Sequence, residues 1–130
     1  MVKKLIINAD DLGFSLGVNH AILKANTEGF LSHASLMANT EYFDHAIEEI
    51  IPQSKNLKIG VHINLTCAKA LFSDNILTEN GLLNNTFVKL LFKYKSKKFL
   101  QSIEKEIELQ LLKIKEKGIQ ISHIDGHEHV

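Results

Sequence analysis

The densest group of side chains able to do chemistry lies at the end of the chain. The segment His123-Ile124-Asp125-Gly126-His127-Glu128-His129 holds three of the seven histidines and two acids. Imidazole nitrogens and carboxylate oxygens are the ligands that zinc and neighbouring transition metals favour. Apolar Ile119, Ile121 and Ile124 precede and interleave the cluster, which is typical of a buried strand end rather than an exposed histidine-rich terminus. The segment therefore predicts ligands for a divalent metal ion.

Two adjacent carboxylates, Asp10 and Asp11, follow a short apolar run near the start of the chain. One carboxylate can bind a cation while the other takes a proton from the water that the cation activates. An aspartate in this position also commonly caps a helix or closes a turn. The pair by itself does not decide between these two explanations.

His62 interrupts an apolar segment with clean alternation. One face of this predicted strand carries Leu57, Ile59, Val61, Ile63 and Leu65, and the other carries His62 and Asn64. A buried imidazole needs a polar partner, and a histidine alone in a strand is more often a hydrogen-bonded core residue than a ligand. The remaining histidines, His20, His33 and His45, are expected in surface or capping roles.

The chemically active residues follow predicted strands. Apolar periodicity predicts strands at residues 5–8, 32–38, 57–65 and 119–125, and helices at residues 18–28, 39–51, 87–94 and 100–114. Ser15 is expected to cap the first helix, Asn39 or Thr40 the second, and Pro52 to stop that second helix. Residues 66–85 are expected to form a long irregular loop.

This alternation of strands and helices predicts an α/β fold of parallel βαβ units. Ligand sites in such sheets gather at the carboxyl ends of the strands, where all three clusters fall. The length and composition, 130 residues with 45% apolar and 23% charged, are typical of a single globular domain spanning residues 1–130.

Charge and composition narrow the classes of partner. The 15 basic residues, all lysine, balance 15 acids, so no net charge would attract nucleic acid or an anionic membrane. Because the sequence contains no arginine, it has no guanidinium group to bind phosphate through two parallel hydrogen bonds. A single cysteine, Cys67, cannot form an internal disulfide, and the short apolar run after Met1 is too short for a signal-peptide core. These features predict a cytoplasmic protein without a nucleic-acid or membrane partner.

Three ordered segments, residues 8–13, 60–66 and 123–129, together resemble the signature segments of the YdjC-like (ChbG/HpnK) carbohydrate deacetylases. The Ser35-Leu36-Met37 segment and the helix containing Glu108 and Gln110 resemble connecting segments of the same family. The similarity covers nearly the whole chain. It implies a metal-dependent hydrolase that removes N-acetyl groups from amino sugars or oligosaccharides, built on an irregular (β/α) barrel.

The resemblance also implies roles for individual residues. Asp11, His62 and His127 correspond to the ligands of one divalent ion, Mg²⁺ or Zn²⁺, and Asp10 to the general base. His123 and His129 become candidates for the catalytic acid. The residues expected to contact substrate or to orient the ligands are Asn8, Asn64 and Asp125.

The chain departs from the family pattern in two places. It resembles only the first half of the barrel, since an eight-stranded barrel needs about 250 residues, and Thr66-Cys67-Ala68-Lys69-Ala70 lacks the expected Gly-x-Pro. A half-barrel exposes a sheet edge and apolar surface, which predicts a homo-oligomer. Two alternatives stay open: a truncated, non-catalytic remnant that binds metal or sugar, and a metal-dependent phosphoesterase, which the missing arginines disfavour.

Overall fold

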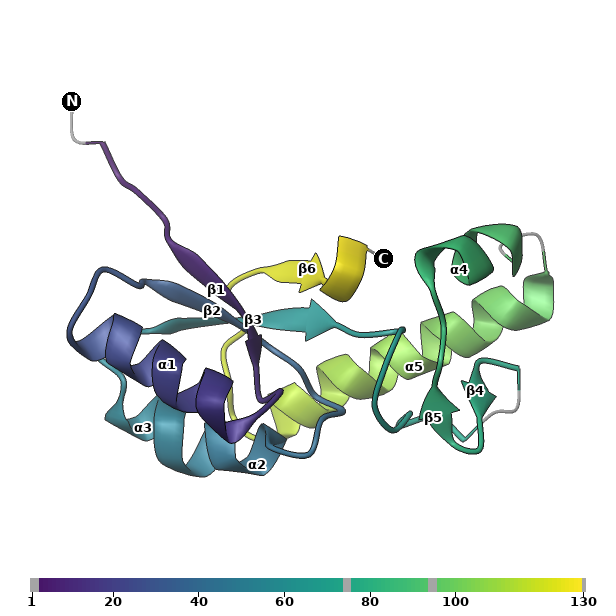
Figure 1. Cartoon of the computed structure of the whole chain (residues 1–130), viewed down its shortest axis with the longest axis horizontal. Helices are drawn as coiled ribbons and strands as arrows, with labels where there is room; N and C mark the ends of the chain where they lie inside the picture. Colours follow the sequence, from purple (N-terminus) through teal and green to yellow (C-terminus); the bar gives the residue numbers. More distant parts are fainter. Residues whose placement is uncertain (1–2, 74–75, 94–95, 130) are drawn as a thin grey trace.

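A computed structural model describes residues 3–73, 76–93 and 96–129. Its main sheet has the strand order β1-β2-β3-β6, and every neighbouring pair is parallel (Figure 1). The strands are β1 (Asn8–Leu12), β2 (His33–Leu36), β3 (Lys58–Ile63) and β6 (Ile124–Gly126). The predicted α/β fold with parallel βαβ units is confirmed.

The first strand begins at Asn8, later than the apolar run predicted, and it contains both aspartates. Leu5 and Ile6, expected inside the strand, are 79% and 66% exposed, and Figure 1 shows the chain before β1 leaving the sheet. Pairing with β2 begins only at Asn8, which lies opposite His33. The expected loop at the aspartates is therefore wrong, because the neighbouring strand, rather than local hydrophobicity, decides where β1 starts.

The last strand is also shorter than predicted. Ile119 and Ile121 pack against the core without belonging to β6, which begins at Ile124. Their segment is held to β3 by two backbone hydrogen bonds, from the Ser122 amide to the Ile59 carbonyl and from the Val61 amide to the His123 carbonyl. The apolar spacing thus identified Ile119 and Ile121 as core residues correctly. It was wrong for Ile124, which is 60% exposed, and for the extent of regular pairing.

Helix α1 (Leu16–Thr27) follows β1, and the Ser15 hydroxyl accepts a hydrogen bond from the Val18 amide, as predicted for its N-cap. The next helical segment comprises α2 (Phe43–His45), a π-helical turn (Ala46–Ile50) and α3 (Ile51–Gln53). Figure 1 shows α1 and this segment together on one side of the sheet.

The predicted ends of that second helical segment are wrong. It starts at Phe43 after Tyr42, which makes no side-chain capping bond, and the Thr40 hydroxyl instead donates to the Met37 carbonyl. It ends at Gln53 rather than before Pro52, because the proline lies in the first turn of α3, directly after the wider π-helical turn.

Part of the expected irregular loop is a small hairpin. Strands β4 (Thr78–Glu79) and β5 (Leu82–Leu83) pair antiparallel. Asn80 and Gly81 connect them with φ angles of 53° and 78°, the left-handed backbone that an Asn-Gly turn adopts readily. Leu77 and Leu83 are buried, so the hairpin is held by the core rather than free in solvent.

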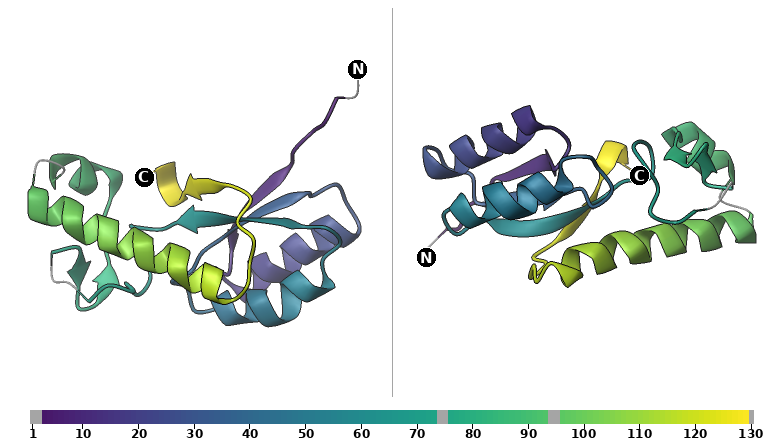
Figure 2. Two further views of the ribbon diagram at one scale, coloured as in Figure 1. Left: turned by 180° about the vertical axis from the view of Figure 1, so that it is seen from behind. Right: turned by 90° about the horizontal axis from the view of Figure 1, so that it is seen from below.

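Helices α4 (Phe87–Lys93) and α5 (Lys97–Glu116) complete the described part; Tyr94, expected in the α4 stripe, lies outside it. The buried face of α5 is not the one that the apolar spacing of residues 100–114 predicts. Leu100 is half exposed, whereas the fully buried line consists of Phe99, Ser102, Glu106, Gln110 and Ile114. Figure 2 shows α5 running past the strand ends toward α4. No helix among the described residues has the length and apolarity to span a bilayer.

Two of the buried α5 residues are polar because they bind backbone. The Glu106 carboxylate accepts hydrogen bonds from the Leu71 and Phe72 amides, and Gln110 bonds to both the amide and the carbonyl of Asn64. Buried backbone groups outside regular pairing require such partners. Helix α5 thereby anchors the loop that follows β3.

Candidate metal centre

Parallel pairing gathers the predicted site residues near the carboxyl ends of the strands. Asp10 and Asp11 lie in β1, His62 in β3, Asp125 in β6 and His127 in the 3₁₀ turn that follows. His62 and Asp125 are register partners. All of them line one cavity of about 490 Å³, together with Gly126 and Glu128.

The three predicted ligands, Asp11, His62 and His127, come together around one oxygen of Asp11. Its Oδ1 atom lies 3.2 Å from the Nε2 atom of His62 and 2.9 Å from the Nδ1 atom of His127. This oxygen is buried, yet no hydrogen bond reaches it within the described residues. Ligand atoms about 2.1 Å from a tetrahedral ion stand about 3.4 Å apart. The donor set and its spacing therefore fit a divalent ion.

A bulge in β1 directs both aspartates into this cavity. From Ala9 to Leu12, β1 advances by three residues while β2 advances by two, from Ala34 to Leu36. Regular alternation would send adjacent side chains to opposite faces, and an extra residue in a strand re-aims them. Asp11 itself has a φ of 65°, in the left-handed region. Such backbone costs a non-glycine residue about 1–3 kcal/mol, and it is common at functional sites.

His62 is held in one orientation by Asp125. The Nδ1 atom of His62 lies 2.7 Å from the Oδ1 atom of Asp125, and the imidazole is 3% exposed. Because the carboxylate can only accept, Nδ1 carries a proton, and Nε2, which faces Asp11, is the nitrogen that can bind an ion. A carboxylate behind the far nitrogen is the usual support of a metal-binding histidine.

Asp10 lies at the exposed rim of the cavity. The Asn8 side-chain amide donates to its Oδ1 atom at 2.8 Å and also to the Ser35 hydroxyl at 2.9 Å. Asp10, His62 and Asp125 form a second group whose ligand atoms lie within 4.8 Å of one another. The Asn8 amide therefore orients the Asp10 carboxylate, which stays accessible to solvent.

Two further predicted site residues, His123 and Asn64, do not line this cavity, and Asn8 is connected to it through its hydrogen bond to Asp10. His123 lies behind it, with Nε2 at 3.0 Å from the Ser35 hydroxyl and its ring 5.6 Å from the ring of His33. Asn64 is fully buried and braces the turn after β3 through hydrogen bonds to Asn39 and Cys67. His129 ends the 3₁₀ turn, and its side chain lies outside the described part of the structure.

The sequence did not predict a role for Ser35, the residue through which β2 contacts the site. Its hydroxyl contacts Asn8, His123 and Asp125, and the side chain is fully buried. Its contribution to the site had no sequence signal beyond a small polar residue inside an apolar strand. His33, expected in a surface or capping role, lines a separate cavity of about 310 Å³ together with His123.

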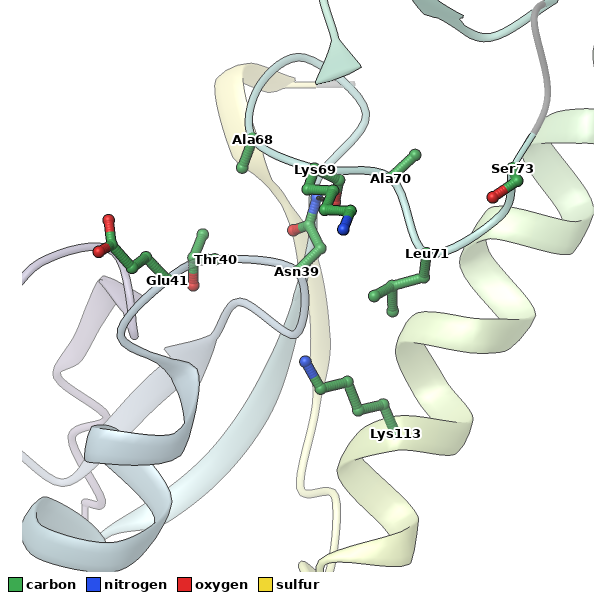
Figure 3. Close-up of a pocket in the computed structure, with 9 residues that line it drawn as sticks. All are labelled: Asn39, Thr40, Glu41, Ala68, Lys69, Ala70, Leu71, Ser73 and Lys113. Carbon is green, nitrogen blue, oxygen red and sulfur yellow. Dashed lines mark hydrogen bonds between the residues drawn. The ribbon is translucent and has the colours of Figure 1, made fainter. Parts of the chain in front are cut away.

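A larger cavity of about 730 Å³ lies elsewhere, and Figure 3 shows the side chains that surround it. None of its lining residues is a predicted site residue. Its Lys113 amine donates to the Ala38 carbonyl at 2.8 Å, and burial lowers the pKa of this lysine. The lining contains no histidine and one acid, Glu41. Chemistry rather than size therefore identifies the smaller cavity as the candidate metal centre.

Comparison with known proteins gives a consistent result. The family profile described as YdjC-like protein matches residues 4–130. A carbohydrate deacetylase of Brevibacillus brevis is 35% identical over 129 residues, 98% of this chain and 50% of the relative. The carbohydrate deacetylase of Vibrio campbellii is 35% identical over 127 residues, 97% of this chain and 49% of the relative.

A crystal structure of an Enterococcus faecalis protein, described as a candidate for cellobiose-phosphate cleavage, superposes with a TM-score of 0.85 at 29% identity. The match covers 98% of this chain and 49% of that one. The chain thus spans about half the length of the curated relatives and of the solved structure that it matches.

Proposed function

The chain belongs to the YdjC-like family, and on that premise we propose that it acts in the divalent-metal-dependent removal of N-acetyl groups from amino sugars or oligosaccharides. The observation that carries the proposal is the convergence of two imidazole nitrogens on a buried oxygen of Asp11, which receives no hydrogen bond from any residue that the structure describes. The names of the curated relatives support a carbohydrate substrate.

In this proposal Asp11, His62 and His127 hold the ion. Two nitrogen donors and one oxygen donor favour Zn²⁺ or a neighbouring transition metal, whereas Mg²⁺ prefers oxygen ligands alone. When bound, the ion would polarise the amide carbonyl and make water a better nucleophile at neutral pH. Asp125 accepts a hydrogen bond from the Nδ1–H group of His62 and so leaves Nε2 as the nitrogen that would bind the ion.

Asp10 is the proposed general base. Its carboxylate lines the cavity beside the three ligands, and the Asn8 amide fixes its orientation. It takes a proton from the water that attacks the carbonyl carbon. The C–N bond then breaks, the amine leaves with a proton, and acetate is the second product. His129 stays a candidate for the group that protonates the amine, while the position of His123 favours a supporting role.

Calorimetry and an acetate-release assay test this assignment. One Zn²⁺ or Co²⁺ per chain is expected, with binding lost in Asp11→Asn and His127→Ala. Asp10→Asn should keep the metal and lose acetate release from N-acetylglucosamine oligomers. Glu41→Gln, an exposed acid on the other cavity, is the matched control and should change neither. Unchanged acetate release by Asp10→Asn would refute its role as the base.

A second candidate function is binding of metal or sugar without catalysis. It requires only the ligand set of Asp11, His62 and His127, without a base or an acid. In that case the parent chain binds metal, and Asp11→Asn abolishes binding, but acetate is not released. A phosphoesterase is less favoured because the chain lacks arginine. Phosphodiester hydrolysis that survives His62→Ala would revive it.

We also propose self-association. Within the described part of the chain, β1 and β6 each have one neighbouring strand, so both edges of the main sheet are unpaired. The exposed apolar residues of α4 include Phe87, Val88, Leu91 and Phe92. Open edges and apolar surface favour association. Sedimentation velocity should show a dimer or larger species, and a stable monomer at all concentrations would refute this.

A further inference from the structure

The hub of the polar network behind the metal centre is a side chain without charge. Ser35 lies in β2, opposite Gly60 of β3, and is fully buried. Its hydroxyl oxygen lies 2.6 Å from Asp125 Oδ2, 2.9 Å from Asn8 Nδ2 and 3.0 Å from His123 Nε2. Asn8 comes from β1, whereas Asp125 lies in β6 and His123 directly precedes that strand.

The direction of these hydrogen bonds follows from the number of protons available. A serine hydroxyl has one proton to donate and two lone pairs. The Asp125 carboxylate can only accept, and at 2.6 Å it would be repelled by a lone pair. It therefore accepts the hydrogen bond that the Ser35 hydroxyl donates. The Asn8 amide donates to one lone pair, and an N–H at Nε2 of His123 donates to the other. All three bonding positions of the hydroxyl are thereby used.

This arrangement connects Ser35 to both halves of the proposed centre. On one side, Ser35 holds Asp125 Oδ2, while the other oxygen of that carboxylate accepts from His62. On the other side, the Asn8 amide donates both to Ser35 and to Asp10. One hydroxyl therefore sets the orientation of the carboxylate behind a ligand and, through Asn8, of the proposed base.

Gly60 makes the third contact possible. A Cβ atom built on Gly60 would collide with the imidazole of His123, so only glycine lets this ring lie across β3 and reach Ser35. The His123 ring in turn lies beside the ring of His33. Ser35 of β2, Gly60 of β3 and His123, directly before β6, thus belong to one network.

We propose that Ser35 is a positioning residue that fixes the ring of His62 through Asp125, and Asp10 through Asn8. This inference rests on the metal centre proposed above. Removing the hydroxyl frees Asp125 to rotate, so the Nδ1–H form of His62 loses its fixed acceptor. Outer partners of metal ligands typically contribute 10–100-fold to metal affinity. We expect Ser35→Ala to weaken Zn²⁺ binding by about tenfold, at the lower end of that range.

Two measurements on the 130-residue chain test this role. Zinc affinity is measured by competition calorimetry, and the protonated nitrogen of His62 by ¹⁵N-¹H NMR of the metal-free chain. Ser35→Ala should lose about tenfold in affinity and give a mixture of His62 tautomers in place of Nδ1–H alone. Ser35→Thr, which keeps the hydroxyl, should restore both. Ser102→Ala, the same change at another buried serine bonded to a backbone carbonyl, is the control and should alter neither.

The outcomes separate this inference from the proposed function. Parent-like affinity and a single His62 tautomer in Ser35→Ala would overturn the role of Ser35, as would an equal loss in Ser102→Ala. A parent chain that binds no zinc would instead remove the proposed centre. The His62 tautomer in the metal-free variants would still decide whether Ser35 positions the ring. If Ser35→Thr fails to fold, Ser35→Cys, with a weaker donor, should give an intermediate result.

Discussion

Two carboxylates, the fully buried Glu106 and the half-buried Asp11, have opposite surroundings. Both oxygens of Glu106 accept hydrogen bonds: one takes the Leu71 and Phe72 amides, and the other takes the Gln110 side chain. Among the described residues, the buried oxygen of Asp11 accepts none, although two imidazole nitrogens lie within 3.2 Å. A carboxylate satisfied by backbone amides stabilises a loop. One that faces two ring nitrogens is suited to share a cation with them.

The largest effect on stability is expected at the satisfied carboxylate. Glu106→Ala leaves the part-buried amides of Leu71 and Phe72 without their acceptor and removes one of the hydrogen bonds of Gln110. Each unsatisfied buried group costs about 1–3 kcal/mol. We expect the free energy of unfolding in urea to fall by about 3 kcal/mol or more. Glu108→Ala, an exposed acid on the same helix, is the control. A small loss in Glu106→Ala would show that this network is not structural.

The second carboxylate should behave in the opposite way. Asp11→Asn tolerates the left-handed backbone, because asparagine is among the residues that adopt it most readily, so the metal-free chain should unfold near the parent's temperature. Zinc at a hundredfold excess over its dissociation constant should stabilise the parent by about 2.7 kcal/mol and leave Asp11→Asn unchanged. Thermal unfolding with zinc and with EDTA measures this. Equal zinc stabilisation of both chains would contradict the assignment.

The network behind the centre offers a smaller, geometric test. Gly60→Ala places a Cβ atom in the ring of His123, and overpacking of this kind costs about 1–3 kcal/mol. Gly17→Ala, whose Cβ would meet only Ser15 at 3.9 Å, is the matched control and should be neutral or stabilising. Urea unfolding of both variants checks the difference. Equal stabilities would mean that the His123 ring does not occupy this position.

The smallest effect concerns Cys67, beside the centre. Burial raises the pKa of its thiol, and the charges of Glu128 and Asp11 raise it further. A raised pKa means less thiolate at a given pH, so alkylation by iodoacetamide at pH 8 should be slower than for glutathione. Glu128→Gln should accelerate alkylation slightly, whereas Glu79→Gln should not. The unfolded thiol ionises first, so this contribution to stability is lost as pH rises above about 8.5.

The sequence predicted the parallel α/β fold and the positions of the four main strands to within a few residues. Two mispredictions have a common physical cause. Strand β1 starts where β2 can pair with it, at Asn8, and the most buried line of α5 includes polar Glu106 and Gln110 because loop amides need partners there. Hydrophobic periodicity reports burial of side chains, but it does not report where backbone groups find hydrogen bonds.

Residue types and their positions at strand ends predicted a divalent-metal site, because carboxylate and imidazole groups suit a metal whatever the details of packing. The resemblance to the family then implied Asp11, His62 and His127 as the ligands. Only the tertiary structure decided how these residues are held. The bulge that directs both aspartates into one cavity, the hydroxyl of Ser35 and the space above Gly60 depend on contacts among the four strands of the main sheet. Such contacts join residues far apart in the chain, so no local pattern in the sequence records them.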